Sequence, residues 1–421
     1  MRISSSLNGP SNDSDWQLYE YFIDVTICIP EHEDYQLNQL QIEGMYIEKD
    51  FDNDHLPVLL LDVAISVLLE QEIKENASDV TFILNVTGYI KDTDNPDIPN
   101  DQKLIMSGIY TPLIVNTTPD NNSFIRKKIR ATNEANDNDF MLEDLTNKVT
   151  YILYKKDMAT SVRTIVNNVL PNVDLTTAIS YLLTGAGVKR VVMSNLDNTE
   201  IIPELLLLPI PMLSELIYLN NYYGLHKEGT QIFADFDTLY INRMSGKCTA
   251  WEKNEPTQVT FFIGDSRSGE SLAKGIIVED NVVFINVEKD AYELSDKTMA
   301  TDQTVANNTI LINENDATFS TVDTGGEFTT VKSTVGHNQY LESMIQIRQK
   351  ENACSITLMV NNIDISVLTP NKQYNFITTN TEIIDDVKGS YRLCVAGTTL
   401  IREATHYYPS TFMVLKRIPE E

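Results

Sequence analysis

Short runs of β-branched and aromatic residues, separated by polar turns, fill both ends of this 421-residue chain and limit its fold more than any other feature. The first run, at 21–29, ends at Pro30. Similar runs are found at 81–86, 104–115, 232–236, 239–241, 258–263, 275–278, 282–287, 355–360, 363–368, 391–395 and 412–415. Asn361 and Asn362 tolerate positive φ, so we expect a hairpin turn there. Many short strands divided by polar turns are typical of a β-sandwich or barrel.

The middle of the chain follows a helical period instead. A first helix, capped by Thr160 and stopped by Pro171, is predicted from apolar residues at helical spacing: Val162, Ile165, Val166, Val169 and Leu170. A second helix is predicted to start at the cap Asp174 and to end at Gly185. A third is predicted at 211–224, between a proline and a glycine. Three short helices therefore separate two β-rich regions.

These patterns predict an α+β fold that is mainly β, with two β-barrel-like domains and a short helical segment between them. Residues 1–15 are expected to form a polar, flexible N-terminal arm. The first barrel-like domain is expected at 16–150, the helical connecting segment at 151–225 and the second barrel-like domain at 226–421. Residues 56–72 fit either a helix or another strand. The second domain is left open to being discontinuous with the first.

Charge and composition exclude several function classes. The net charge is −28, from 60 acidic and 32 basic residues, and such a surface repels nucleic-acid phosphates and anionic membranes. No run approaches the ~18 apolar residues of a membrane helix. The first 15 residues have no apolar stretch and the four cysteines are scattered, so we expect no secretion leader and no disulfide framework.

Motifs for metals, cofactors and phosphates are missing or incomplete. Residues 50–55 begin like a calcium-binding loop, but His55 and Leu61 stand where that loop needs glycine and a bidentate glutamate. None of the five histidines has zinc-site spacing, and no phosphate-binding loop is found. We therefore expect no metal, no cofactor and no catalytic residue.

One alternative is an enzyme. Gly264-Asp265-Ser266 follows an apolar run and resembles the nucleophile block of the GDS(L) lipases and esterases, with His406 as a candidate base. The helices that alternate with strands in that family do not follow Ser266 here. A second alternative is a β-rich adhesin or carbohydrate-binding protein, which the two tryptophans and the lack of a secretion leader disfavour.

The stretch from about 151 to 241 carries a family resemblance. A helix ending in Tyr223-Gly224 precedes a strand pattern that reads Phe233-Ala-Asp-Phe-Asp-Thr-Leu-Tyr240. This order resembles the baseplate hub proteins of phage tails and related contractile injection systems.

The resemblance implies a homotrimer in which each subunit has two β-barrel domains. Its ring would join the sixfold tail tube to the threefold central spike, among other baseplate proteins. An acidic lumen fits the charge, since DNA would pass through it without binding. The protein would then be a non-enzymatic component of the virion tail baseplate, assembled in the host cytoplasm and without a membrane span.

Overall fold

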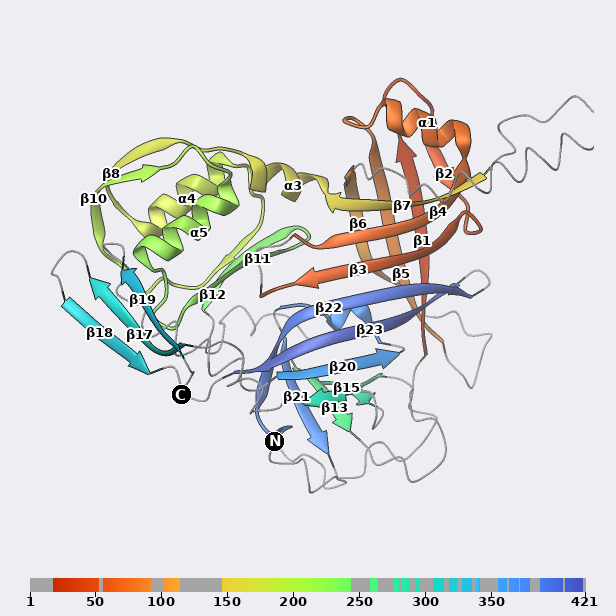
Figure 1. Ribbon diagram of the computed structural model, residues 1–421. Coiled ribbons are helices and arrows are strands. Elements are labelled where there is room, and N and C mark those ends of the chain that lie inside the picture. Colours follow the sequence, from red (N-terminus) through yellow and green to blue (C-terminus); the bar gives the residue numbers. More distant parts are fainter. Residues whose placement is uncertain are drawn as a thin grey trace, which may run out of the picture.

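A computed structural model gives the fold (Figure 1). It describes residues 18–52, 56–91, 102–113, 146–243, 258–263, 276–279, 282–287, 292–294, 306–313, 318–323, 328–334, 338, 340, 355–361, 363–370, 372–378, 387–403 and 406–418. Strands dominate these residues, so the predicted mainly-β class is confirmed. Among them, no helix is long and apolar enough to cross a membrane.

Strands from both ends of the chain close a β-barrel. The hydrogen-bonded order is β22–β3–β4–β7–β6–β5–β1–β23, and β23 pairs with β22 to complete the circle of eight. The strands are β1 (Leu18–Cys28), β3 (Ile42–Asp50), β4 (Val58–Ser66), β5 (Thr81–Lys91), β6 (Gln102–Leu113), β7 (Thr146–Lys155), β22 (Ser390–Glu403) and β23 (His406–Arg417). Alternate residues of β4, β5, β7 and β23 point inward and are buried, as period-2 patterning requires.

β22 and β23 also belong to a second β region. β23 pairs with β20 (Ser355–Asn361), and β22 pairs with β21 (Gln373–Thr378). The sheet continues through β13 (Gln258–Ile263) to β15 (Val282–Val287) and β14 (Ile276–Glu279), and β16 (Tyr292–Leu294) pairs with β20. One hydrophobic core runs through both regions, from Tyr21 of β1 to Phe261 of β13. The two β regions therefore share two strands and one core.

The remaining sheet elements are small. β2 (Tyr35–Leu37) pairs with β1. β17 (Ala306–Asn313), β18 (Thr318–Asp323) and β19 (Phe328–Thr334) form a separate three-stranded sheet.

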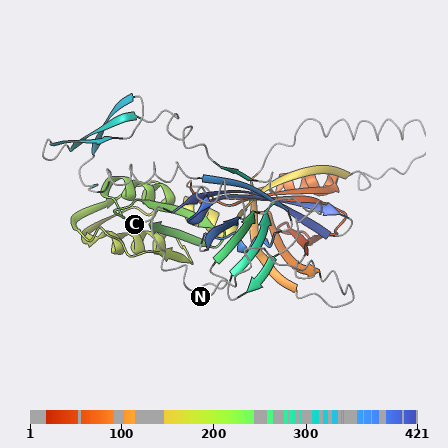
Figure 2. The same cartoon turned by 90° about the horizontal axis from the view of Figure 1, so that it is seen from below.

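Residues 156–243 form a helical module with its own core, beside the barrel in Figures 1 and 2. Its helices are α3 (Lys156–Arg163), α4 (Leu175–Gly185) and α5 (Met212–Tyr223). Its strands are β8 (Asn168–Asp174) paired with β10 (Ile201–Leu207), and β11 (Thr230–Asp235) paired with β12 (Thr238–Arg243), which also pairs with β9 (Val191–Met193). The predicted cap is confirmed, because the Asp174 carboxylate accepts a hydrogen bond from the Thr177 amide.

The predicted helix from Thr160 to Pro171 is wrong. α3 ends at Arg163, and residues 168–174 form β8. Ile165 and Val169, which the helical spacing placed on a core face, are exposed. The β-branched residues of this stretch instead favour a strand, and pairing with β10 provides hydrogen-bond partners for its backbone N–H and C=O groups.

Three further expectations need adjustment. The ambiguous stretch 56–72 contains both structures, since β4 is followed by α1 (Val67–Glu75) with Ser66 as its cap. α4 includes Gly185, and the positive φ beyond its end falls at Gly187. The predicted strand at 363–368 is wrong: this stretch holds the 3-10 helix η4 (Ile365–Val367), because the Tyr21 side chain bonds the Ile363 carbonyl and the Ile365 amide.

Candidate functional site

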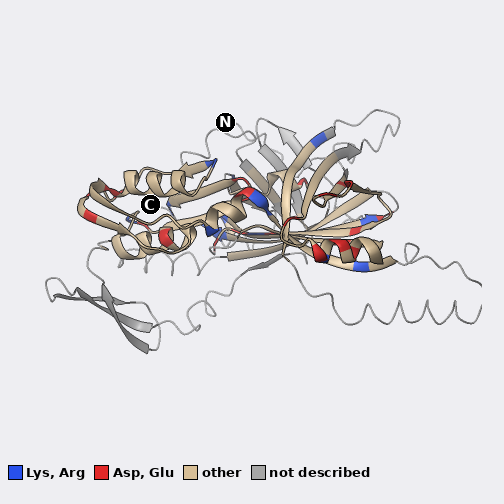
Figure 3. Cartoon of the chain, turned by 90° about the horizontal axis from the view of Figure 1, so that it is seen from above, with Lys and Arg blue, Asp and Glu red and all other residues tan. Residues whose placement is uncertain are grey.

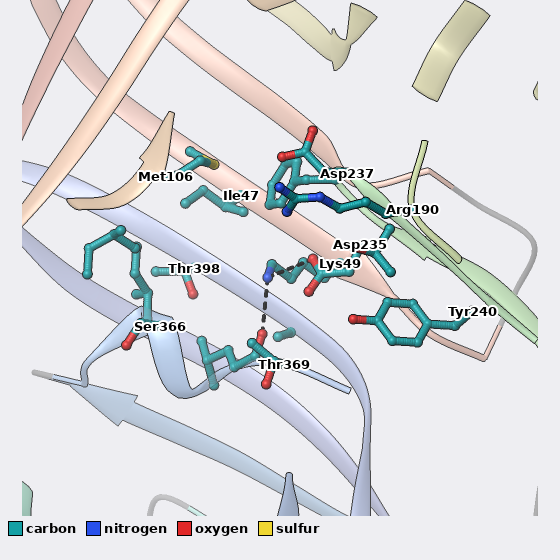
Figure 4. A pocket seen from close by; sticks show the side chains of 16 residues that line it. Ile47, Lys49, Met106, Arg190, Asp235, Asp237, Tyr240, Ser366, Thr369 and Thr398 are labelled. Carbon is teal, nitrogen blue, oxygen red and sulfur yellow. Dashed lines mark hydrogen bonds and ion pairs between the residues drawn. The ribbon is translucent and has the colours of Figure 1, made fainter. Parts of the chain in front are cut away.

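The joint between the helical module and the barrel is the best-defined polar site among the described residues. It contains a cavity of ≈ 270 Å³ between β3, β6, β22, η4 and the β11–β12 turn (Figure 4). The lining combines apolar, hydroxyl-bearing and charged side chains. The charged members are Lys49, Arg190, Asp235 and Asp237.

Lys49 of β3 holds the β11–β12 turn to the barrel. Its Nζ lies 2.9 Å from Oδ1 of Asp235, donates to the Leu368 carbonyl at 3.1 Å, and lies 5.1 Å from the centre of the Phe236 ring. Both charged side chains are nearly buried. Phe236 sits in the turn with φ of 48°, a left-handed conformation that is rare for a large side chain. The turn is thus fixed by its contacts with the barrel.

A second lysine acts in the same way from β7. Lys155 Nζ lies 3.2 Å from Oδ1 of Asp237, donates to the Ser107 carbonyl at 2.7 Å and lies over the Tyr110 ring. Asp235 and Asp237 are the two acidic residues of the strand pattern 233–240 in the stretch that carried the family resemblance. Their geometry gives that motif a structural role, because it attaches the helical module to the barrel.

Asp52 forms a third attachment. Its Oδ1 accepts from Arg392 Nη1 at 2.7 Å and from Gln231 Nε2 at 3.3 Å, and its Oδ2 accepts from Lys416 Nζ. Burial raises the pKa of Asp52, but the charges of Arg392 and Lys416 outweigh burial and lower the pKa to about 2. One carboxylate therefore joins the β3–β4 turn to both shared strands and to β11.

These attachments were not expected from the sequence. Asp52 lies in the acidic stretch 50–55, whose only sequence signal was an incomplete calcium-binding loop, and residues 53–55 lie outside the described residues. Lys49 and Lys155 belong to no recognised motif, and each lies near the end of its strand.

The candidate hydrolase residues are not brought together by what the structure describes. Gly264, Asp265 and Ser266 lie outside the described residues. His406 begins β23 and is paired across the hairpin with Glu403. Among the described residues, no three His, Cys, Asp or Glu side chains cluster in a way that could hold a metal ion.

A different serine, histidine and aspartate do meet, in the helical module. Ser194 Oγ lies 3.4 Å from His226 Nε2, and His226 Nδ1 lies 3.8 Å from Asp197 Oδ2. The ring of His226 is fully buried, whereas Asp197 is bound at 2.5 Å by Arg243. Burial lowers the pKa of His226 to about 4; the Asp197 carboxylate opposes this and Arg243 adds to it.

The hydrogen bonds of this cluster indicate a structural role. Ser194 Oγ accepts from the Arg243 amide at 3.2 Å and lies 3.3 Å from the Ile241 carbonyl, while Asp197 also accepts from the Lys227 amide. The three side chains tie the β9–β10 loop to β12 and to the loop after α5. No sequence motif predicted this cluster, because its three residues are not at the spacing of any recognised motif.

Comparison with known proteins gives one family and several solved structures. The model of the family described as Bacteriophage PBS1 gene 109 protein matches residues 17–418. No curated protein sequence matches the chain. The crystal structure of the tail protein from Neisseria meningitidis MC58 is similar with a TM-score of 0.50 and 11% identity, over 94% of this chain and 97% of that one.

Two further structures come from PdpA–VgrG complexes. The lidded Francisella complex matches with a TM-score of 0.51 and 9% identity, over 97% of this chain and 55% of that one. The lidless complex matches with a TM-score of 0.51 and 9% identity, over 98% and 67%. At such identities the likeness concerns the fold. Together with the phage family, it confirms the predicted resemblance to phage tail baseplate hub proteins.

Proposed function

The chain belongs to the bacteriophage PBS1 gene 109 protein family, and from this premise we propose that it is a structural virion protein, the trimeric hub of a tail baseplate. The hub joins the sixfold tail tube to the threefold central spike and contacts other baseplate proteins. It is assembled in the host cytoplasm and has no enzymatic activity. The observation that carries this proposal is the pair of β regions that share β22 and β23, in a fold common to a phage tail protein.

The strands shared by the two β regions support the proposed adaptation from a sixfold tail tube to a threefold spike. Each chain contributes a closed barrel and a second β region joined to it through β22 and β23. Three chains arranged around a threefold axis would therefore present six β units to a sixfold partner. The common core and the Asp52 attachment keep the two units of one chain at a constant relative position, which a ring of six units requires.

The interior of the barrel is filled with side chains, and this limits where DNA could pass. The inward side chains of the eight strands form a continuous core, so a passage has to lie between the copies of a ring. With a net charge of −28, the walls of such a passage would repel phosphate groups. Figure 3 shows acidic residues on α1 and on the helical module. We propose that the lumen is acidic and that DNA passes through it without binding.

The proposal is tested by mass and by partner binding. Light scattering should give the mass of three 47.6 kDa chains, and the protein should bind the tail tube and central spike proteins of the same phage. A stable monomer at micromolar concentration that binds neither protein would overturn the hub. Hydrolysis of a short-chain ester that is lost in Ser266→Ala would overturn the non-enzymatic part.

A further inference from the structure

A carboxylate buried at one end of the barrel bridges an amine and an amide. Glu70 lies in the first turn of α1, which packs beside β4 and β7 (Figure 1). Its Oε1 lies 2.6 Å from Nζ of Lys74, and its Oε2 accepts a hydrogen bond from Nδ2 of Asn147 at 2.6 Å. The three side chains therefore form one cluster, in which a single carboxylate contacts both nitrogen atoms.

The cluster combines buried groups with an accessible one. Glu70 and Asn147 are 5% and 7% exposed, whereas the side chain of Lys74 is 47% exposed. Asn147 begins the inward row of β7, which continues with Val149 and Tyr151. An asparagine in such a core position has to find its hydrogen-bond partners inside the protein. In the part of the chain that the structure describes, the buried Oδ1 of Asn147 makes no hydrogen bond, so its amide is only half satisfied.

A second ion pair on β7 provides a comparison. Lys148 follows Asn147 in sequence and points outward, and its Nζ lies 2.6 Å from Oε1 of Glu43. The side chain of Lys148 is largely exposed, as is usual for a surface ion pair. The Lys74–Glu70 pair has the same length, but its carboxylate is buried and is shared with a core amide. This sharing is the feature that needs an explanation.

We propose that Lys74 and Asn147 become joined by an isopeptide bond, with Glu70 as the catalytic residue. The Lys74 amine is the nucleophile, the side-chain amide of Asn147 is the acyl group, and ammonia is the leaving group. A base in contact with both reactants activates the amine and keeps the two groups together, which are the two requirements of such a reaction. This inference goes beyond the proposed hub and does not depend on it.

The reaction transfers an acyl group and moves only protons, so nothing is oxidised or reduced. The Glu70 carboxylate takes a proton from the Lys74 ammonium, and the free Nζ attacks Cγ of Asn147. The Nζ–Cγ bond forms, and the Cγ–Oδ1 electron pair moves onto Oδ1. Glu70 then gives its proton to Nδ2, the Cγ–Nδ2 bond breaks and the carbonyl forms again. Ammonia leaves with a further proton from Nζ as an ammonium ion, and Glu70 ends as a carboxylate.

The surroundings of the cluster suit this reaction. Leu69 and Ile73 are buried on the same face of α1 as Glu70, which limits the access of water to the reacting groups. The phenol of Tyr151 is also buried, and burial together with the charge of Glu70 raises its pKa, so it stays uncharged. The accessible side of Lys74 gives ammonia a route to solvent.

The bond closes residues 74–147 into a covalent loop that contains β5 and β6. It fixes the last turn of α1 to the start of β7. A cross-link of this kind restricts the unfolded chain and thereby favours the folded one. It also keeps both parts of the chain together when the backbone is cut within the loop.

The test is mass spectrometry of the denatured full-length chain. The native protein should weigh less than its sequence by one ammonia, and its tryptic digest should contain a branched peptide that joins Lys74 to Asn147. Glu70→Gln should slow bond formation at least about a hundredfold and so retain the full mass. Lys74→Arg keeps the positive charge beside Glu70 without the nucleophile and should also retain the full mass. Lys148→Arg is the matched control and should still contain the branched peptide.

A second measurement uses the covalent loop directly. Native protein that a protease has cut once between residues 74 and 147 should run as one species in a reducing, denaturing gel, whereas cut Lys74→Arg should separate into two fragments. Two fragments from both proteins would contradict the bond.

The outcomes separate the bond from its alternatives. A native protein of full mass would overturn the inference, whether or not the variants fold. Loss of ammonia without a branched peptide would show that an asparagine has cyclised, and would also overturn it. A branched peptide at undiminished yield in Glu70→Gln would overturn the role of Glu70. None of these measurements depends on the oligomeric state, so a failure of the hub would be recognised separately.

Discussion

The barrel and the helical module differ in where their residues come from. The barrel joins strands from the first 155 residues to the two last strands of the chain, β22 and β23. The helical module is built from one continuous stretch, 156–243, with a separate core. The barrel is therefore a product of long-range pairing, and the module is a product of local structure that is then attached through Lys49, Lys155 and Asp52.

They also differ in how they bury ionisable groups. At the joint, the Asp52 carboxylate is bound by two cations. In the module, Glu215 is fully buried with neither carboxylate oxygen in a hydrogen bond of normal geometry, and Nδ1 of the buried His226 makes no hydrogen bond either. The difference teaches that the buried carboxylate at the joint depends on being charged, whereas the buried Glu215 and His226 of the module depend on being uncharged. Three substitutions test this contrast.

The largest effect is expected at the joint. Asp52→Ala removes the carboxylate that Arg392 and Lys416 share, and Arg392 is almost completely buried. Loss of one partner of a buried ion pair costs about 3–5 kcal/mol, so the midpoint of urea unfolding should fall strongly. Asp157→Ala, which removes an exposed pair with Lys189, is the control and should leave the midpoint within error. Equal midpoints for the two variants would contradict the role of Asp52.

An effect of intermediate size is expected from His226 and depends on pH. The pKa of this histidine is about 4 in the folded protein, below its ordinary value of 6.5, so only the unfolded chain binds a proton between these two values. The contribution of His226 to the free energy of unfolding should therefore have its full value above pH 6.5. It should decrease as the pH drops to 4, by up to about 3 kcal/mol.

His226→Gln removes the titrating ring and should flatten this part of the pH profile. The measurement is the free energy of unfolding of both proteins at pH 4, 5, 6 and 7. Parallel profiles for the native protein and the variant would show that His226 is not the group responsible.

The smallest effect is expected at Glu215, with the opposite sign. Burial raises the pKa of this carboxyl, and the Leu208 backbone opposes the increase only in part. The folded state therefore favours the protonated form, and stability is lost as the pH rises through the raised pKa. Glu215→Gln should increase the melting temperature by about 2–4 °C at pH 8 and leave it unchanged at pH 4. An increase of the same size at both pH values would argue against titration of Glu215.

The individual strands were largely predictable because alternation of apolar and polar residues is a local pattern. β13 (Gln258–Ile263) has the predicted bounds, and α5 ends at the predicted Gly224, whose φ of 73° explains the glycine. The stretch after α3 was mispredicted because five apolar residues matched a helical period, and only the pairing of β8 with β10 decides for a strand. Local spacing does not report such a pairing.

The closure of the barrel and the attachments at the joint could not be predicted. They depend on residues that are far apart in sequence, such as Asp52 with Arg392 and Lys416. The family resemblance was found in residues 151–241, but it did not predict that this stretch attaches the helical module to the barrel. Only the contacts of Asp235 and Asp237 with lysines on β3 and β7 show that this stretch fastens the module to the barrel.

The place of β22 and β23 has a consequence for synthesis. The barrel lacks its closing strands until residues 390–417 have left the ribosome, because these strands connect β3 to β1 around the circle. Until then, the edges of β1 and β3 stay open and the Asp52 carboxylate has no cation to bind. The helical module, which needs only its own residues, can fold earlier. A nascent or truncated chain would thus lack a closed barrel, and only finished copies could enter the ring.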